Sequence, residues 1–190
     1  VYADDPFTEE VEPSEEFALG LLAYNDGKGD ARNFTITSAQ PKIIENEKGL
    51  LIDFKIVGTQ VGDQTVAPTL TANLGNIAAG QAQVAQWNMT SSLQGKFIDY
   101  TATFEHLDGM GDTRLSLIES VNIHELIRSV KANAGDAPDF LANDDPDSEH
   151  TPDRLYMNDG SHHVVKTLAS ASANRTAAAG ALAVTLTADA

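Results

Sequence analysis

Apolar and polar residues alternate along much of this 190-residue chain, which is the spacing of β-strands that bury one face. The alternation is clearest from residue 82 to residue 105. In its first half the apolar residues Ala85, Trp87 and Met89 stand at every second position. In its second half Ile98, Tyr100, Ala102 and Phe104 do the same. Because only residues 91–95 separate the two halves, we expect a central hairpin with Trp87 facing the core.

Other segments show strand-like spacing and are separated by Gly, Pro, Asn and Asp residues, which favour turns. These segments are residues 17–24, 33–37, 42–44, 50–57 and 69–74, with residues 58–68 expected as a loop. Residues 115–130 suit either a strand or an amphipathic helix. We favour a strand through Ile123 or beyond, because the earlier segments already specify an all-β domain.

The pattern predicts an all-β protein, an Ig-like antiparallel β-sandwich with a C-terminal β-hairpin and strand extension. We expect an acidic extended lead-in at residues 1–16 and the sandwich at residues 17–132. An acidic linker rich in Asp and Pro follows at residues 133–153, and a hairpin plus terminal strand occupies residues 154–190. That last part is either a strand-donating extension or part of a second domain, because three strands rarely form a core alone.

Two features of the C-terminal part carry information. The Asp159-Gly160 step predicts a tight turn between two short strands. Residues 169–180 are mostly Ala, Ser and Thr, and we expect them to be a flexible arm. Beyond the arm, Leu182, Val184 and Leu186 alternate with small polar residues, so we expect this strand to contact a neighbouring subunit. The alternative is pairing with an edge of its own domain, which is the more usual arrangement.

The chain is strongly acidic, with 28 acidic against 12 basic residues and a net charge of −16. This charge excludes duplex nucleic acid and anionic membrane surfaces as partners, because both require clusters of Lys and Arg. No apolar run approaches the roughly 20 residues that span a bilayer, so we expect no membrane insertion. The chain has no Cys, which excludes disulfides and thiolate chemistry. It begins at Val1 without Met, from which we expect a mature product or a segment of a longer protein.

Clustered carboxylates are candidate calcium ligands, because Ca²⁺ prefers hard oxygen donors. One group lies in a Gly-rich turn and the other in the acidic linker: Asp108 and Asp112, then Asp139, Asp144, Asp145 and Asp147. Neither group matches the loop of an EF-hand. The alternative is a set of solvated carboxylates that keep the protein soluble, and no other cofactor is expected.

Three sequons are candidate glycosylation sites, and they begin at Asn33, Asn88 and Asn174. We expect Asn33 and Asn88 on outward faces of strands and Asn174 in the flexible arm. Trp87 and Tyr100 are candidates for an aromatic platform that binds glycans, but both fall on faces assigned to the core. Core packing is the favoured interpretation of the two aromatics.

No pattern of catalytic residues is present, and we expect the protein not to be an enzyme. There is no Cys and no G-x-S-x-G nucleophile motif. His162 and His163 are adjacent, so on a strand they point to opposite faces and do not bind one metal together. Pairs of carboxylates are uninformative in a chain with so many acids.

Two Gly-based stretches resemble modules of bacterial surface and secreted proteins. Residues 24–36, YNDGKGDARNFTI, resemble the strand-turn-strand opening of CARDB-like and related Ig-like repeat modules, and residues 74–81, LGNIAAGQ, resemble a later turn in them. The resemblance implies an Ig-type sandwich that acts as a spacer, adhesion or assembly unit in a long extracellular polypeptide. The acidic linker and the hairpin after it depart from a single module.

Together these features favour a non-enzymatic structural or adhesion module at the cell surface or in the extracellular space. We expect it to assemble with copies of itself, or with neighbouring modules, through β-strand contacts. The alternative is a carbohydrate-binding or enzyme-accessory module whose partners are glycans.

Overall fold

A computed structural model describes residues 2–42, 52–95, 99–105, 118–145, 147–148, 150–166, 171–178 and 181–188. This part of the chain is all-β and antiparallel, as the alternation predicted, and it contains no helix. Its strands are β1 (Phe17–Tyr24), β2 (Ala31–Lys42), β3 (Phe54–Val61), β4 (Gln64–Val66), β5 (Ala72–Ile77), β6 (Ala82–Ser91), β7 (Asp99–Glu105), β8 (Glu125–Val130), β9 (Asp139–Asn143), β10 (Arg154–Tyr156), β11 (His162–Val164), β12 (Ala171–Ala178) and β13 (Ala181–Ala188).

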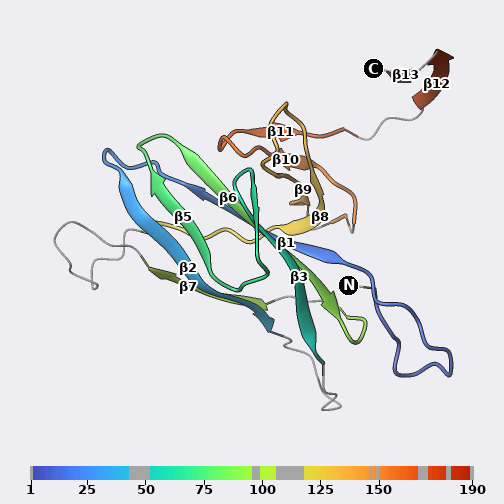
Figure 1. Cartoon of the computed structure of the whole chain (residues 1–190), viewed down its shortest axis with the longest axis horizontal. Helices are drawn as coiled ribbons and strands as arrows, with labels where there is room; N and C mark the ends of the chain where they lie inside the picture. The colour runs from blue at the N-terminus through green and yellow to red at the C-terminus, as the bar shows by residue number, and fades with distance from the viewer. Residues whose placement is uncertain are drawn as a thin grey trace.

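Two sheets enclose the main core (Figure 1). The first sheet has the order β1-β6-β3-β4 and the second sheet has the order β5-β2-β7. Their shared core comes from one face of β6 and from β2 and β5, and its buried members are Ile36, Ala72, Leu74, Ile77, Ala85, Trp87 and Met89. This arrangement is the expected β-sandwich, with apolar side chains of two sheets packed together.

Trp87 lies at the centre of this core and is fully buried, as predicted. Its indole N–H donates a hydrogen bond to the carbonyl of Thr69 over 3.0 Å. The hydroxyl of Thr59 donates to the same carbonyl and accepts from the Thr69 N–H, each over 3.0 Å. The polar end of the ring is therefore satisfied inside an apolar environment, as burial requires.

The central hairpin predicted for residues 82–105 is wrong. β6 pairs with β1 on one side and β3 on the other, whereas β7 pairs with β2 in the second sheet. The chain therefore crosses from one sheet to the other after β6. Both edges of β6 already have a partner within the first sheet, so the short connection does not bring β7 beside it.

A third sheet, with the order β11-β10-β9-β8, covers the outer face of the first sheet (Figure 1). Phe140 on β9 is 6 % exposed and lies directly over Gly20 of β1. A Cβ atom at Gly20 would be 2.6 Å from Cε1 of the Phe140 ring, so only glycine fits there. The acidic linker expected at residues 133–153 therefore contains a buried strand.

The turn between β10 and β11 forms as the Asp159-Gly160 step predicted. Gly160 has a φ of +90°, and its N–H donates to the carbonyl of Met157 over 2.9 Å. The turn packs against the first sheet, since a Cβ at Gly160 would be 2.6 Å from Cδ2 of Tyr24. Gly160 is thus required both by its backbone conformation and by close packing.

Strands β12 and β13 form a two-stranded sheet, which we call the terminal hairpin. Figure 1 places it apart from the three other sheets. The flexible arm expected at residues 169–180 is therefore wrong for β12, which is a strand paired along its whole length with β13.

Three smaller expectations also differ from the structure. The expected loop at residues 58–68 contains the β3–β4 hairpin, and residues 118–124, expected as strand, precede β8. The lead-in is fastened to the end of β6, because Asp4 forms a bridge with Leu93 and Ala3 is buried. Ser14 adds a 2.6 Å hydrogen bond from its hydroxyl to the carbonyl of Ser91.

The contact between Phe140 and Gly20 is testable by a double-mutant cycle. Phe140→Ala is expected to lower the free energy of unfolding by about 3–5 kcal/mol, because it empties a filled site. Gly20→Ala is expected to cost about 1–3 kcal/mol by overpacking, and that cost should vanish in the Phe140→Ala background. Urea unfolding measures all four chains. Gly29→Ala is the control, since a Cβ there meets nothing within 4 Å; equal costs at the two glycines would contradict the packing described.

Candidate functional site

The third sheet brings a histidine, an aspartate and a tyrosine together at one end. The register that pairs Glu125 of β8 with Asn143 of β9 places the next residues, His124 and Asp144, side by side. Nδ1 of His124 is 2.6 Å from Oδ1 of Asp144, and the hydroxyl of Tyr156 donates to Oδ2 of Asp144 over 2.5 Å. The rings of His124 and Tyr156 are in contact, with centroids 4.6 Å apart and planes tilted by 45°. We call these three residues the His-Asp-Tyr cluster.

The electrostatics of the cluster favour an ionised Asp144. Burial acts to raise the pKa of Asp144, but hydrogen bonds from Tyr156 and His124, with the charges of His124 and Arg154, outweigh it and lower the pKa. Burial and the adjacent carboxylate raise the pKa of Tyr156 to about 12. The tyrosine hydroxyl therefore keeps its proton and serves as a hydrogen-bond donor at neutral pH.

A second contact between a histidine and a carboxylate lies beside the cluster and holds the loop that follows β9. Nδ1 of His150 is 2.9 Å from Oε1 of Glu125, and the amide of Asn143 donates to Oε2 over 2.9 Å. The hydrogen bond from Asn143, assisted by His150, lowers the pKa of Glu125. The Asn143 amide also donates to the carbonyl of Ser148 over 2.5 Å.

Asp139 is the one fully buried carboxylate among the described residues. Its Oδ2 accepts from the N–H of Ala132 and its Oδ1 from the N–H of Asn158, both over 2.8 Å. These bonds tie the segment after β8 and the turn after β10 to the start of β9. A buried carboxylate with such partners acts as a fastener between segments.

The contacts of Asp144 link separate segments of the third sheet. Nδ1 of His124, which directly precedes β8, and the hydroxyl of Tyr156 on β10 each lie within hydrogen-bond distance of one oxygen of Asp144. These contacts join β8, β9 and β10 to one another at one end of the third sheet.

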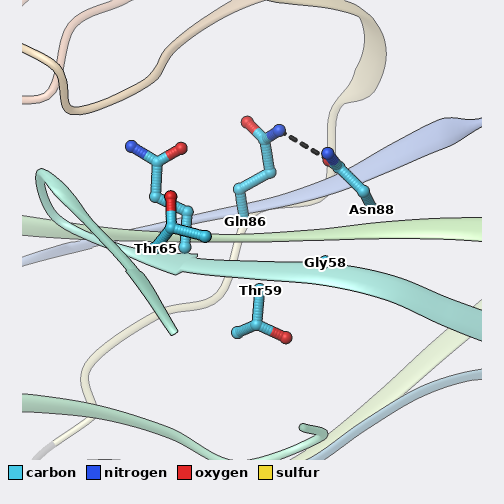
Figure 2. Close-up of a pocket in the computed structure, with 6 residues that line it drawn as sticks. Gly58, Thr59, Thr65, Gln86 and Asn88 are labelled. Carbon is cyan, nitrogen blue, oxygen red and sulfur yellow. Dashed lines mark hydrogen bonds between the residues drawn. The ribbon is translucent and has the colours of Figure 1, made fainter. Parts of the chain in front are cut away.

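The first sheet has a small polar hollow on the face that meets the third sheet. Gly58, Thr59, Gln60, Thr65, Gln86 and Asn88 line it, and Figure 2 shows the amides of Gln86 and Asn88 on the same side, joined by a 2.7 Å hydrogen bond. The hydroxyl of Ser129 donates to Oε1 of Gln86 over 2.5 Å, and Nε2 of Gln60 donates to the carbonyl of Asp136 over 2.8 Å. None of these described lining residues is aromatic.

The predicted calcium ligands do not converge where the structure describes them. Asp108 and Asp112 lie outside the described residues. Asp139 and Asp144 are bonded as above, and Oδ1 of Asp145 accepts the N–H of Asp147 over 3.0 Å in a local turn. Within the described ranges, no three His, Asp or Glu side chains form a group suited to a metal ion. Calcium binding stays a prediction.

The candidate glycosylation sites have different surroundings. Asn33 is exposed, with a φ of +51°, and its N–H donates to Oδ1 of Asn76 over 2.9 Å. Asn88 points away from the core as expected, but it is half-buried in the polar hollow. Asn174 lies in β12, opposite Thr185 of β13. Glycosylation of the three stays a prediction.

Trp87 is not part of an exposed aromatic platform, because it is fully buried in the core. Core packing was the favoured interpretation of this residue, and the structure confirms it. The side chain of Tyr100 lies outside the described residues, although its backbone pairs with Pro41.

The predicted assembly residues lie in β13 of the terminal hairpin. Leu182 pairs with Ala177, Val184 with Arg175 and Leu186 with Ala173. Of the strands that the structure describes, β12 is the one that pairs with β13, so β13 has one paired edge. The alternative of pairing with an edge of its own sandwich is not what the described strands show.

Comparison with known proteins adds no relative: no protein family, curated protein or solved structure that was compared matches the chain. The resemblance to CARDB-like modules therefore stays a prediction. In the described residues there is also no helix long and apolar enough to cross a membrane.

Sequence reasoning missed His124, Glu125 and Tyr156 as a group with Asp144. The register of β8 and β9 creates the group, and β9 was not recognised as a strand. The apolar triplet Phe140-Leu141-Ala142 was the available signal, but it is surrounded by acidic residues.

The His-Asp-Tyr cluster predicts a pH-dependent contribution to stability. A carboxyl whose pKa is lowered on folding contributes stability above its unfolded pKa and loses it as the pH falls through the lowered folded value. Asp144→Asn is therefore expected to cost about 1–2 kcal/mol at neutral pH and progressively less in acid. Urea unfolding between neutral pH and strong acid measures this, with Asp147→Asn as the matched exposed control. A cost for Asp144→Asn that is independent of pH would contradict the assignment.

Proposed function

We propose that this chain is a non-enzymatic structural module of an extracellular repeat protein or filament. In this proposal it associates with copies of itself, or with neighbouring modules, through β-strand contacts. The observation that carries the proposal is the terminal hairpin. Its two strands pair with each other, and it stands apart from the three other sheets (Figure 1).

An isolated pair of strands is at best marginally stable in water, because it has no second layer to cover an apolar face. Leu182, Val184 and Leu186 occupy every second position of β13, which is the sequence spacing of an apolar strand face. Joining the sheet of another subunit would supply both a backbone partner and a longer sheet. The hairpin is therefore a connector that requires a second molecule or module.

The polar groups of the body support a structural role. Asp139, Asp144 and Glu125 each accept hydrogen bonds that join separate segments of the chain. These carboxylates are occupied within the fold, so they reinforce the third sheet. The acidic surface, with a net charge of −16, would keep such a module soluble and its bodies apart.

The Ig-like character of the sandwich and its resemblance to CARDB-like modules belong to the same proposal. Two antiparallel sheets around a buried Trp are compatible with an Ig-type sandwich, and modules of this type serve as spacers and adhesion units. In this proposal the module lies at the cell surface or in the extracellular space, as the resemblance implies.

The proposal predicts that assembly depends on the terminal strand. Removing residues 181–190 is expected to leave the three body sheets folded and to abolish association, because β13 supplies the contact. Sedimentation velocity over a range of concentrations measures association, and circular dichroism measures folding. A truncated chain that assembles as the full chain does would contradict the proposal, as would a full chain that stays single at every concentration.

A matched pair of double variants separates the two faces of β13. Leu182→Lys with Leu186→Lys places charges on the apolar face and is expected to weaken association about tenfold or more, since each buried charge is costly. Ala183→Lys with Thr187→Lys adds the same charge to the opposite face and is expected to have a smaller effect. Equal effects would indicate that net charge, not the apolar face, controls association.

A further inference from the structure

The outer edge of β1 is the part of the first sheet best suited to accept another strand. β1 pairs with β6 and with no other described strand, so it ends the sheet. Its eight residues, FALGLLAY, contain no charge and no Pro, and its register with β6 is unbroken. Proteins normally protect sheet edges with charges, Pro, bulges or short strands, and β1 has none of these devices.

The other edges in the described part of the chain are protected. β4 and β11 have three residues each, which is too short for extended pairing. β5 joins β2 through an irregular register, and β8 combines an irregular register with the charges of Glu125 and Arg128. β7 carries an acidic residue at each end, Asp99 and Glu105. β1 is therefore the edge at which pairing would meet the least opposition.

The terminal hairpin offers a strand of matching character. β13 has eight residues, ALAVTLTA, as β1 does, and contains no charge or Pro. Its partner β12 carries Arg175, so β13 is the uncharged edge of the hairpin. Two uncharged strands of equal length can pair along their whole length without burying an unpaired charge.

We propose that β13 of one copy pairs with β1 of a second copy of this chain. The contact would extend the first sheet to the order β12-β13-β1-β6-β3-β4. This inference rests on the proposed function and names its partner and acceptor. Because donor and acceptor are different surfaces, each copy offers one of each, and the contact is heterologous. Such a contact continues from copy to copy and builds an open filament unless the rotation closes a ring.

Amide hydrogen exchange of the full chain tests the acceptor directly. Outward-pointing N–H groups at a sheet edge exchange readily, and alternate amides of β1 gain hydrogen bonds if another strand pairs there. On raising the concentration from the single chain to the assembled state, we expect alternate β1 amides to exchange about tenfold slower or more. The amides of β4, β5 and β7 should keep their rates.

Two variants at one position of β13 test whether β13 is the strand that pairs with β1. Val184→Pro removes a backbone donor and disrupts the strand in a hairpin that stands apart from the core, whereas Val184→Ile keeps the strand. We expect Val184→Pro to abolish both the association and the protection of β1, and Val184→Ile to retain both. Unchanged exchange in β6 would confirm that the body of each variant is folded.

The outcomes separate this inference from the proposed function. Assembly with slower exchange at another edge, or with unchanged β1 exchange, overturns the β1 acceptor and leaves the proposed function standing. Protection of β1 that does not depend on concentration shows that the edge is covered within one copy and overturns the inference. A Val184→Pro chain that assembles with β1 protected removes β13 as the donor. A chain that stays single at all concentrations overturns both proposals.

Discussion

The structure depends on the position of β6, which has a strand at each edge and contacts another sheet on each face. Trp87 and Met89 on one face enter the sandwich core, while Val84 on the other face is equally buried. β1 and β3 occupy the two edges. A strand enclosed in this way fixes the second sheet on one side and the third sheet on the other, and most of the apolar stabilisation of the body arises around it.

The alternation of residues predicted which side chains of β6 face the core, but not which strands lie beside it. Alternation with a period of two residues shows which face of the strand each side chain lies on, because one face is buried and the other is not. Strand partners depend on contacts distant in sequence, so the short connection after Ser91 suggested a hairpin that does not form. The unbroken apolar run of β1 was the available signal that a strand lies between two layers, since a strand covered on both faces has no polar side.

The third sheet was the least predictable part, for a related reason. Acidic residues surround β9, and charge density normally indicates a solvated segment. Here Asp139 is buried with two backbone donors, and Asp144 receives donors from His124 and Tyr156, so the charges are part of the fold. Composition counts carboxylates but does not show which of them accept hydrogen bonds. That information exists only once β8, β9 and β10 are in register.

The unprotected edge of β1 follows from the same two-sided packing. Phe17, Leu19 and Leu21 pack against the sandwich core, while Gly20, between them, lies beneath Phe140 of the third sheet. A Lys or Glu within β1 would place a charge in one layer or the other, at the cost of burying it. The usual way of protecting an edge strand is therefore excluded by the architecture over most of β1. An edge that packing keeps uncharged has to be covered by another segment or used for pairing, and the chain carries in β13 a strand of the same length and character.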